Sequence, residues 1–96
     1  MRRLKLMADY ECHPLWGTVA TEIGDVDPAS LPISAALVAD LAAWAAAYDA
    51  TLDRADPAAS GFATDEAAAA FRARGAVLAR RLEAELGAGY EIVFVP

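Results

Sequence analysis

Residues 34–52, which read SAALVADLAAWAAAYDATL, carry the strongest structural signal in the sequence. The large apolar residues recur every three or four positions, the spacing of one helix face: Leu37, Leu41, Trp44, Tyr48 and Leu52. Ser34 is a favourable N-cap, and Ile33 and Val38 have the spacing of a hydrophobic staple. This stretch therefore predicts an amphipathic helix that buries one face against the rest of the protein.

A second helix is predicted over residues 65–86, because Thr64 can cap its start and Gly87 can end it. Gly75 lies in the middle of its apolar face, although glycine inside a helix costs about 1 kcal/mol relative to alanine. The glycine predicts a close approach of the first helix, with Trp44 or Tyr48 over the missing side chain.

Strands are predicted near both ends of the chain. Residues 3–10 alternate between apolar and polar, and residues 90–95 are apolar almost throughout, which indicates a strand that is central or covered on both faces. Residues 18–23 predict a third, short strand. If the terminal strands pair and the helical hairpin packs on one face of their sheet, residues 1–96 form a single two-layer α+β domain.

Charge is strongly segregated along the chain. Residues 6–71 carry eleven acidic side chains and a single basic one, Arg54, within a net charge of −6. Such a surface steers basic partners and repels anionic ones. It argues against binding to a nucleic-acid backbone, which requires clustered lysine and arginine.

Other composition features predict a cytoplasmic protein. Cys12 is the only cysteine, so no internal disulfide can form. Asp9 follows the N-terminal basic residues too early for an export signal, and Asp40 and Asp49 interrupt the best candidate for a membrane span. The sequence contains no phosphate-binding loop, zinc-protease motif or cysteine pair, so no cofactor is expected and an enzymatic role is disfavoured.

The densest group of reactive side chains lies at Asp9, Glu11, Cys12 and His13, with Trp16 just behind. Cysteine and histidine can act as nucleophile and base or as metal ligands. Adjacent side chains on an extended segment point in opposite directions, however, which works against a shared site. The alternative is structural, with the cysteine as a small buried apolar residue and the histidine at the surface.

Asp49, Asp53 and Asp56 form a second candidate site, which we call the acidic ridge. Asp49 and Asp53 share one side of the first helix, near a helix end that favours cations. The ridge therefore suggests docking onto a basic surface, unless Arg54 or an arginine of the second helix neutralises it.

Two further charged groups have simpler interpretations. The loop acids Glu22, Asp25 and Asp27 suit turns and helix caps better than a cation site, which needs more ligands. The second helix carries a basic cluster, which we expect to pair with Glu83 and Glu85 on a solvent-exposed face: Arg72, Arg74, Arg80 and Arg81.

Several motifs together resemble a family of small bacterial proteins of uncharacterised activity. They are LMADYEC at residues 6–12 followed by PLW at 14–16, DP with LP at 27–32, DP with SGF at 56–62, and LG with YE at 86–91. The resemblance covers most of the chain. It implies no activity, cofactor or catalytic residue.

Three functional hypotheses follow. The first is a small acidic protein that docks a basic protein partner through the acidic ridge, for example an immunity or inhibitor protein acting on a cationic nuclease or another toxin. The second is an enzyme or metal-assisted catalyst centred on Asp9, Glu11, Cys12 and His13. The third is self-association, such as a homodimer, through the alanine-rich outer face of the first helix.

Overall fold

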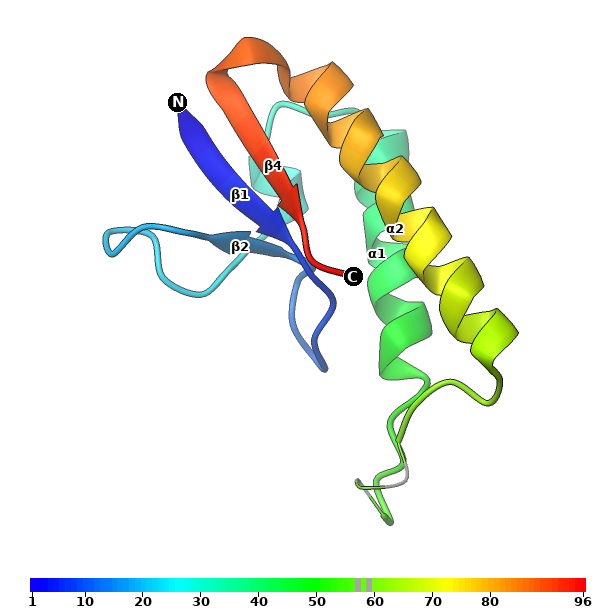
Figure 1. Ribbon diagram of the computed structural model, residues 1–96. Helices are drawn as coiled ribbons and strands as arrows, with labels where there is room; N and C mark the ends of the chain where they lie inside the picture. The colour runs from blue at the N-terminus through cyan, green and yellow to red at the C-terminus, as the bar shows by residue number, and fades with distance from the viewer. Residues whose placement is uncertain (57, 59) are drawn as a thin grey trace.

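The computed structural model of the chain describes residues 1–56, 58 and 60–96. It has a sheet layer and a helix layer (Figure 1). Its elements, in chain order, are β1 (Arg2–Leu6), β2 (Leu15–Gly17), β3 (Asp25–Val26), the 3₁₀ helix η1 (Pro28–Ser30), α1 (Ala35–Asp49), α2 (Asp65–Leu86), the 3₁₀ helix η3 (Gly87–Gly89) and β4 (Tyr90–Phe94).

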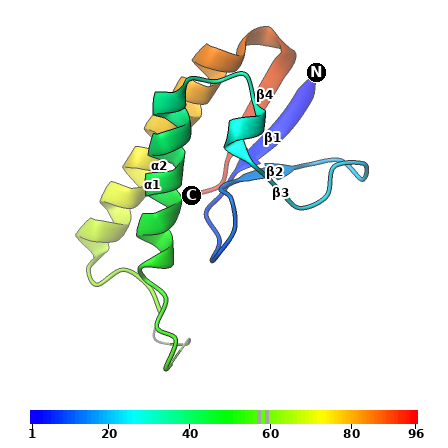
Figure 2. The same ribbon diagram turned by 180° about the vertical axis from the view of Figure 1, so that it is seen from behind.

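The four strands form one mixed sheet in the order β3-β2-β1-β4. β1 pairs with β2 antiparallel and with β4 parallel, so that Leu4 lies opposite Gly17 on one side and Ile92 on the other. The predicted pairing of the terminal strands is confirmed. So is the two-layer α+β class, with α1 and α2 side by side on one face of the sheet (Figures 1 and 2).

Two strand predictions were wrong. β4 is an edge strand rather than a central one. It is not covered on both faces either, because Phe94 packs toward α2 while Val93 on the opposite face is 39% exposed. The segment predicted as a strand at residues 18–23 is instead the turn of a hairpin between β2 and β3, crossed only by a bridge between Val19 and Glu22. The strand forms at residues 15–17 instead, because Leu15 is fully buried in the core. Burial therefore outweighed the β-propensity of residues 18–23.

The helices begin at the predicted caps. The Ser34 hydroxyl accepts a hydrogen bond from the Leu37 N–H at 3.1 Å, and the Thr64 hydroxyl accepts one from the Ala67 N–H at 3.0 Å. Each cap satisfies one of the N–H groups that have no partner within the helix. α1 ends three residues earlier than predicted, at Asp49, and β1 ends at Leu6 rather than Tyr10.

The core lies between the sheet and the two helices. Gly75 allows α2 to pack closely against both β4 and α1, because a Cβ atom at this position would lie 2.6 Å from Phe94 Cζ and 2.7 Å from Trp44 Cζ2. The predicted close approach over Gly75 is therefore confirmed, with Trp44 as the aromatic residue of α1. The Trp44 indole N–H donates to the Phe71 carbonyl at 2.9 Å, so this large buried side chain has no unsatisfied donor.

Candidate functional site

The loop between β1 and β2, residues 7–14, is fixed against the C-terminal end of α1. Its two ends are joined by a hydrogen bond from the Met7 N–H to the Pro14 carbonyl at 2.9 Å. In its middle, the ring of Tyr10 stacks on Tyr48 of α1, with 4.6 Å between the ring centroids. A buried proline and a stacked aromatic pair thus position the predicted reactive residues beside the helix (Figure 2).

Asp49 connects the two sites predicted from the sequence. Its Oδ1 atom accepts a hydrogen bond from the backbone N–H of Glu11 at 2.9 Å. Glu11 has a φ of 60°, in the left-handed region that costs a non-glycine residue roughly 1–2 kcal/mol. The bond to Asp49 helps to stabilise this strained conformation, so Asp49 is part of the loop site as much as of the acidic ridge.

The other two ridge residues lie beyond the end of α1. Asp53 Oδ1 accepts hydrogen bonds from the N–H groups of Ala55 and Asp56, both at 3.0 Å, which is how an aspartate stabilises a turn. Both carboxylate side chains are on exposed residues. Asp53 therefore has a local structural role, while Asp56 has a backbone partner but no described partner for its carboxylate.

Arg54 does not neutralise the ridge. Its guanidinium pairs with Glu11 at 2.6 Å, between side chains that are 74% and 63% exposed. Such an exposed pair contributes little to stability, about 0–1 kcal/mol. In the described part of the chain no arginine lies within ion-pair distance of Asp49, Asp53 or Asp56.

A hollow of about 240 Å³ lies where the loop, η1 and α1 meet, and we call it the alanine-floored hollow. Its lining comprises Cys12, His13 and Pro14 of the loop, Asp27 and Pro28 at the start of η1, and Val38, Ala42, Ala45, Ala46 and Asp49 of α1. The fold thus brings Cys12, His13 and Asp49 to one place. Ala42 and Ala46 also line the hollow. Both belong to the alanine-rich outer face of the first helix, for which the sequence suggested self-association.

The electrostatic environment of the hollow is set by carboxylates. Burial raises the pKa of the Cys12 thiol, and the negative charges of Asp25, Asp9, Asp49 and Glu11 raise that pKa further, in decreasing order. A nucleophilic cysteine needs the opposite, a nearby cation or base that lowers its pKa. The pKa of Cys12 is thus shifted in the direction opposite to that of a nucleophilic thiol, which disfavours the catalytic hypothesis.

The remaining residues of the predicted corner do not form a shared reactive site, although His13 lines the hollow. His13 has an exposed side chain, and only its backbone N–H is engaged, as a donor to Asp25 Oδ2 at 2.7 Å. The Trp16 indole N–H donates to the Met7 carbonyl at 2.8 Å and so ties β2 to the start of the loop. Neither Asp9 nor Trp16 lines the hollow.

The acidic loop residues have structural partners of their own. Glu22 pairs with Arg2, Asp25 accepts from His13, and Asp27 caps η1 by accepting from the Ala29 N–H at 2.9 Å. Among the residues that the structure describes, no group of three or more His, Cys, Asp or Glu side chains is arranged to hold a metal ion. The sequence interpreted Asp25 and Asp27 as turn and cap residues, and only the fold places Asp27 in the lining of the hollow and Asp25 on the backbone of His13 beside it.

The basic cluster of α2 is not neutralised as predicted. Arg81 pairs with Asp40 of α1 at 2.6 Å rather than with Glu83 or Glu85. Glu85 instead accepts hydrogen bonds from the N–H and hydroxyl of Ser34, at 2.6 and 3.0 Å.

Neither described helix combines the length and apolar character needed to cross a bilayer.

Comparison with known protein families gives a match over nearly the whole chain. A family described as Serratia CdiI immunity protein-like matches residues 2–96. The chain belongs to this family. No curated protein matches its sequence.

Membership in an immunity-protein family implies that the partner of this chain is a protein, namely a toxin. It is also consistent with the resemblance to small bacterial proteins. A CdiI-like protein acts by binding, so a surface that suits a protein partner becomes the relevant feature.

Proposed function

We propose that this chain is an immunity protein that neutralises a toxin by docking an acidic face onto a basic surface of that toxin. The acidic face consists of the alanine-floored hollow, the carboxylates around it and the acidic ridge beyond. The observation that carries the proposal is that Asp49 and Asp25, from two separate segments, bond to the backbone of Glu11 and His13 on either side of Cys12, beside a small hollow.

The charge of this face supports a cationic partner. The carboxylates of Asp25, Asp9, Asp49 and Glu11 are all close enough to Cys12 to raise its pKa, and of these only Glu11 is paired with an arginine in the described residues. An excess of unpaired negative charge raises the rate of encounter with a basic surface and discriminates against acidic ones.

The apolar floor supports a protein as the partner. Specific interfaces combine a desolvated apolar centre with a polar rim. The hollow combines both kinds of group, because alanines of α1 and the buried Pro14 line it together with the carboxylates of Asp27 and Asp49. Its volume of about 240 Å³ suits a single large side chain of the toxin.

A nuclease is the toxin class that best fits this chemistry. An enzyme that cleaves nucleic acid binds its substrate through lysine and arginine side chains that contact phosphates. A carboxylate face can occupy that basic surface and exclude the substrate. We also propose the cytoplasm as the place of action, in agreement with the lone cysteine.

The proposal is tested by changing charge without changing shape. Asparagine can accept the hydrogen bonds that Asp49 and Asp53 accept, so Asp49→Asn, Asp53→Asn and Asp56→Asn combined should preserve the fold. We expect the triple variant to bind the cognate toxin about 10- to 100-fold more weakly, with a shallower dependence on salt. Titration calorimetry at two salt concentrations measures both quantities.

The matched control carries the same kind of change elsewhere. Asp40→Asn and Asp65→Asn lie on α1 and at the start of α2, outside the acidic face, and should leave toxin affinity within about twofold. Equal weakening by the control, or unchanged affinity of the triple variant, contradicts the proposed face. Protection of cells that express the toxin gives the biological readout.

A further inference from the structure

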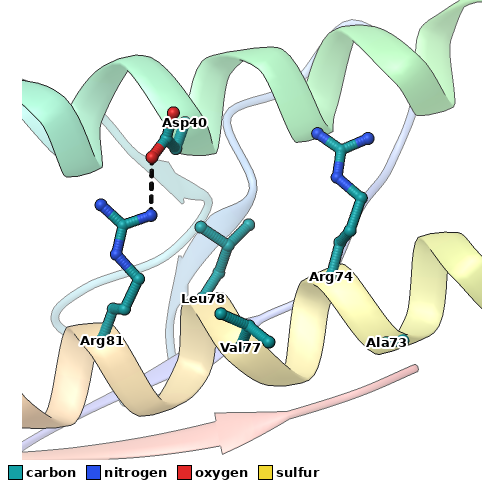
Figure 3. A pocket seen from close by; sticks show the side chains of 6 residues that line it. All are labelled: Asp40, Ala73, Arg74, Val77, Leu78 and Arg81. Atoms are coloured by element: carbon teal, nitrogen blue, oxygen red, sulfur yellow. Dashed lines mark hydrogen bonds and ion pairs between the residues drawn. The ribbon is translucent and has the colours of Figure 1, made fainter.

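A groove of about 390 Å³ lies between α1 and α2, on a different surface from the acidic face. Figure 3 shows its lining: Asp40 of α1, and Ala73, Arg74, Val77, Leu78 and Arg81 of α2. Asp40 is on the opposite flank of α1 from the residues that line the alanine-floored hollow, as the 100° rotation per residue requires. Both surfaces can therefore be occupied at the same time.

The groove has an apolar centre and a guanidinium at each end. Arg74 and Arg81 are seven residues apart, which is two helical turns and about 10.5 Å along the axis. Between them, Leu78 is almost fully buried and forms the floor, while Val77 is 46% exposed. An exposed valine between two arginines is a suitable site for an apolar side chain that carries acidic neighbours.

The two arginines differ in what they already bind. Arg81 is held toward α1 by its ion pair with Asp40, at 2.6 Å. Arg74 extends toward α1 in the same direction (Figure 3), yet no acidic side chain of the described residues lies within ion-pair distance of it. A guanidinium offers a planar fork of donors that matches a carboxylate. The guanidinium of Arg74 is therefore available to bind a carboxylate at its end of the groove.

We propose that this groove binds an acidic segment of a second protein. The complementary segment is a helix that presents one apolar side chain between two carboxylates, spaced seven residues apart. Its apolar side chain contacts Val77 and Leu78, one carboxylate pairs with Arg74, and the other shares Arg81 with Asp40. The site is independent of the proposed toxin-binding face.

A protein segment fits the groove better than other anionic ligands do. An anionic membrane or a nucleic acid requires clustered positive charge, whereas the groove offers two arginines, one of them already paired with Asp40. Asp40 places a carboxylate inside the groove, which disfavours a phosphate group with its higher charge density. An amphipathic helix adds apolar burial to a modest electrostatic term.

The test uses a synthetic helical peptide with two glutamates seven residues apart and a leucine midway between them, labelled with fluorescein. Fluorescence anisotropy at low salt should show saturable binding to the full chain. Arg74→Gln, which removes the charge but keeps most of the side chain, should weaken binding about tenfold, and Val77→Asp should weaken it at least as much. A peptide with lysine in place of both glutamates should not bind.

Arg72→Gln is the matched control. It removes the same charge from the same helix, but Arg72 does not line the groove, so peptide affinity should stay within about twofold. Thermal unfolding verifies that each variant is folded. Absence of saturable binding, or an equal loss in the Arg72 and Arg74 variants, overturns the proposal. Self-association that Arg74→Gln abolishes would also overturn it, because the occupant would then be a second copy of the chain.

Discussion

At the scale of single residues, Gly75 shows how one missing side chain determines packing. Replacing it with alanine should destabilise the protein by about 1–2 kcal/mol. The new methyl group would lie 2.6 Å from Phe94 and 2.7 Å from Trp44, and the cost of overpacking exceeds the gain in helix propensity. Urea denaturation measures the change.

The control for this prediction is Gly89→Ala, at a position where an added Cβ meets no atom within 4 Å. Its stability should remain within about 0.5 kcal/mol of the original. If Gly75→Ala were as stable as Gly89→Ala, the close approach of Trp44 and Phe94 to α2 would be incorrect.

Cys12 tests the electrostatics of the acidic face. Burial, followed by the charges of Asp25, Asp9, Asp49 and Glu11, raises the pKa of its thiol. As pH rises past the ordinary thiol pKa, the unfolded chain ionises first, so stability should fall over this range. The rate of alkylation by iodoacetamide, measured against pH, should likewise give an apparent pKa above that of the unfolded chain.

Asp49→Asn separates the contributions to this shift. It removes one of the charges that raise the Cys12 pKa, so the apparent pKa should decrease relative to the original protein. High salt should act in the same direction, because it screens the carboxylates. An apparent pKa at or below the unfolded value would mean that the carboxylates do not surround the thiol.

At the scale of elements, the hairpin of β2 and β3 depends on a contact that its own sequence does not indicate. β3 has only two residues, and Glu22 in the hairpin turn pairs with Arg2 of β1. The hydrogen bond and charge of Arg2 lower the pKa of the Glu22 carboxyl. The ion pair thus links the turn of this short hairpin to β1, one of the two interior strands of the sheet.

Glu22→Gln should therefore destabilise the protein slightly at neutral pH, because both side chains are partly exposed and such ion pairs contribute little. Since the folded-state pKa is lowered, this stabilisation is present above the ordinary carboxyl pKa and is lost as pH falls through the lowered one. The difference between the two proteins should disappear in acid. Thermal melts across the acidic range measure it, and a difference that persists at the lowest pH would contradict the pairing.

The helices were the elements best predicted from sequence. Ser34 and Thr64 form local hydrogen bonds within their own first turns, and local signals of this kind can be recognised without knowing the fold. The edge position of β4 could not be predicted, because it depends on β2 pairing with the other side of β1. A strand covered by a helix and a strand between two others produce similar apolar patterns.

At the scale of the whole molecule, the charge that was segregated along the sequence becomes two separate surfaces. The acidic face combines the loop after β1, the start of η1 and one flank of α1, whereas the groove with Arg74 and Arg81 lies on the other side of that helix. The toxin-binding prediction and the peptide-binding prediction each concern one of these surfaces. Each can therefore fail without the other.

The sequence by itself determined the two helices, their caps, the need for close packing at Gly75 and the excess of negative charge. These properties depend on residue spacing and composition, which are local or additive. Only the tertiary structure decided that Asp49 bonds to Glu11, that Asp53 serves its own turn, and that Asp25 and Asp27 join the acidic face. Such contacts link segments far apart in the chain, and their geometry exists only once the core has positioned the loop, η1 and α1 together.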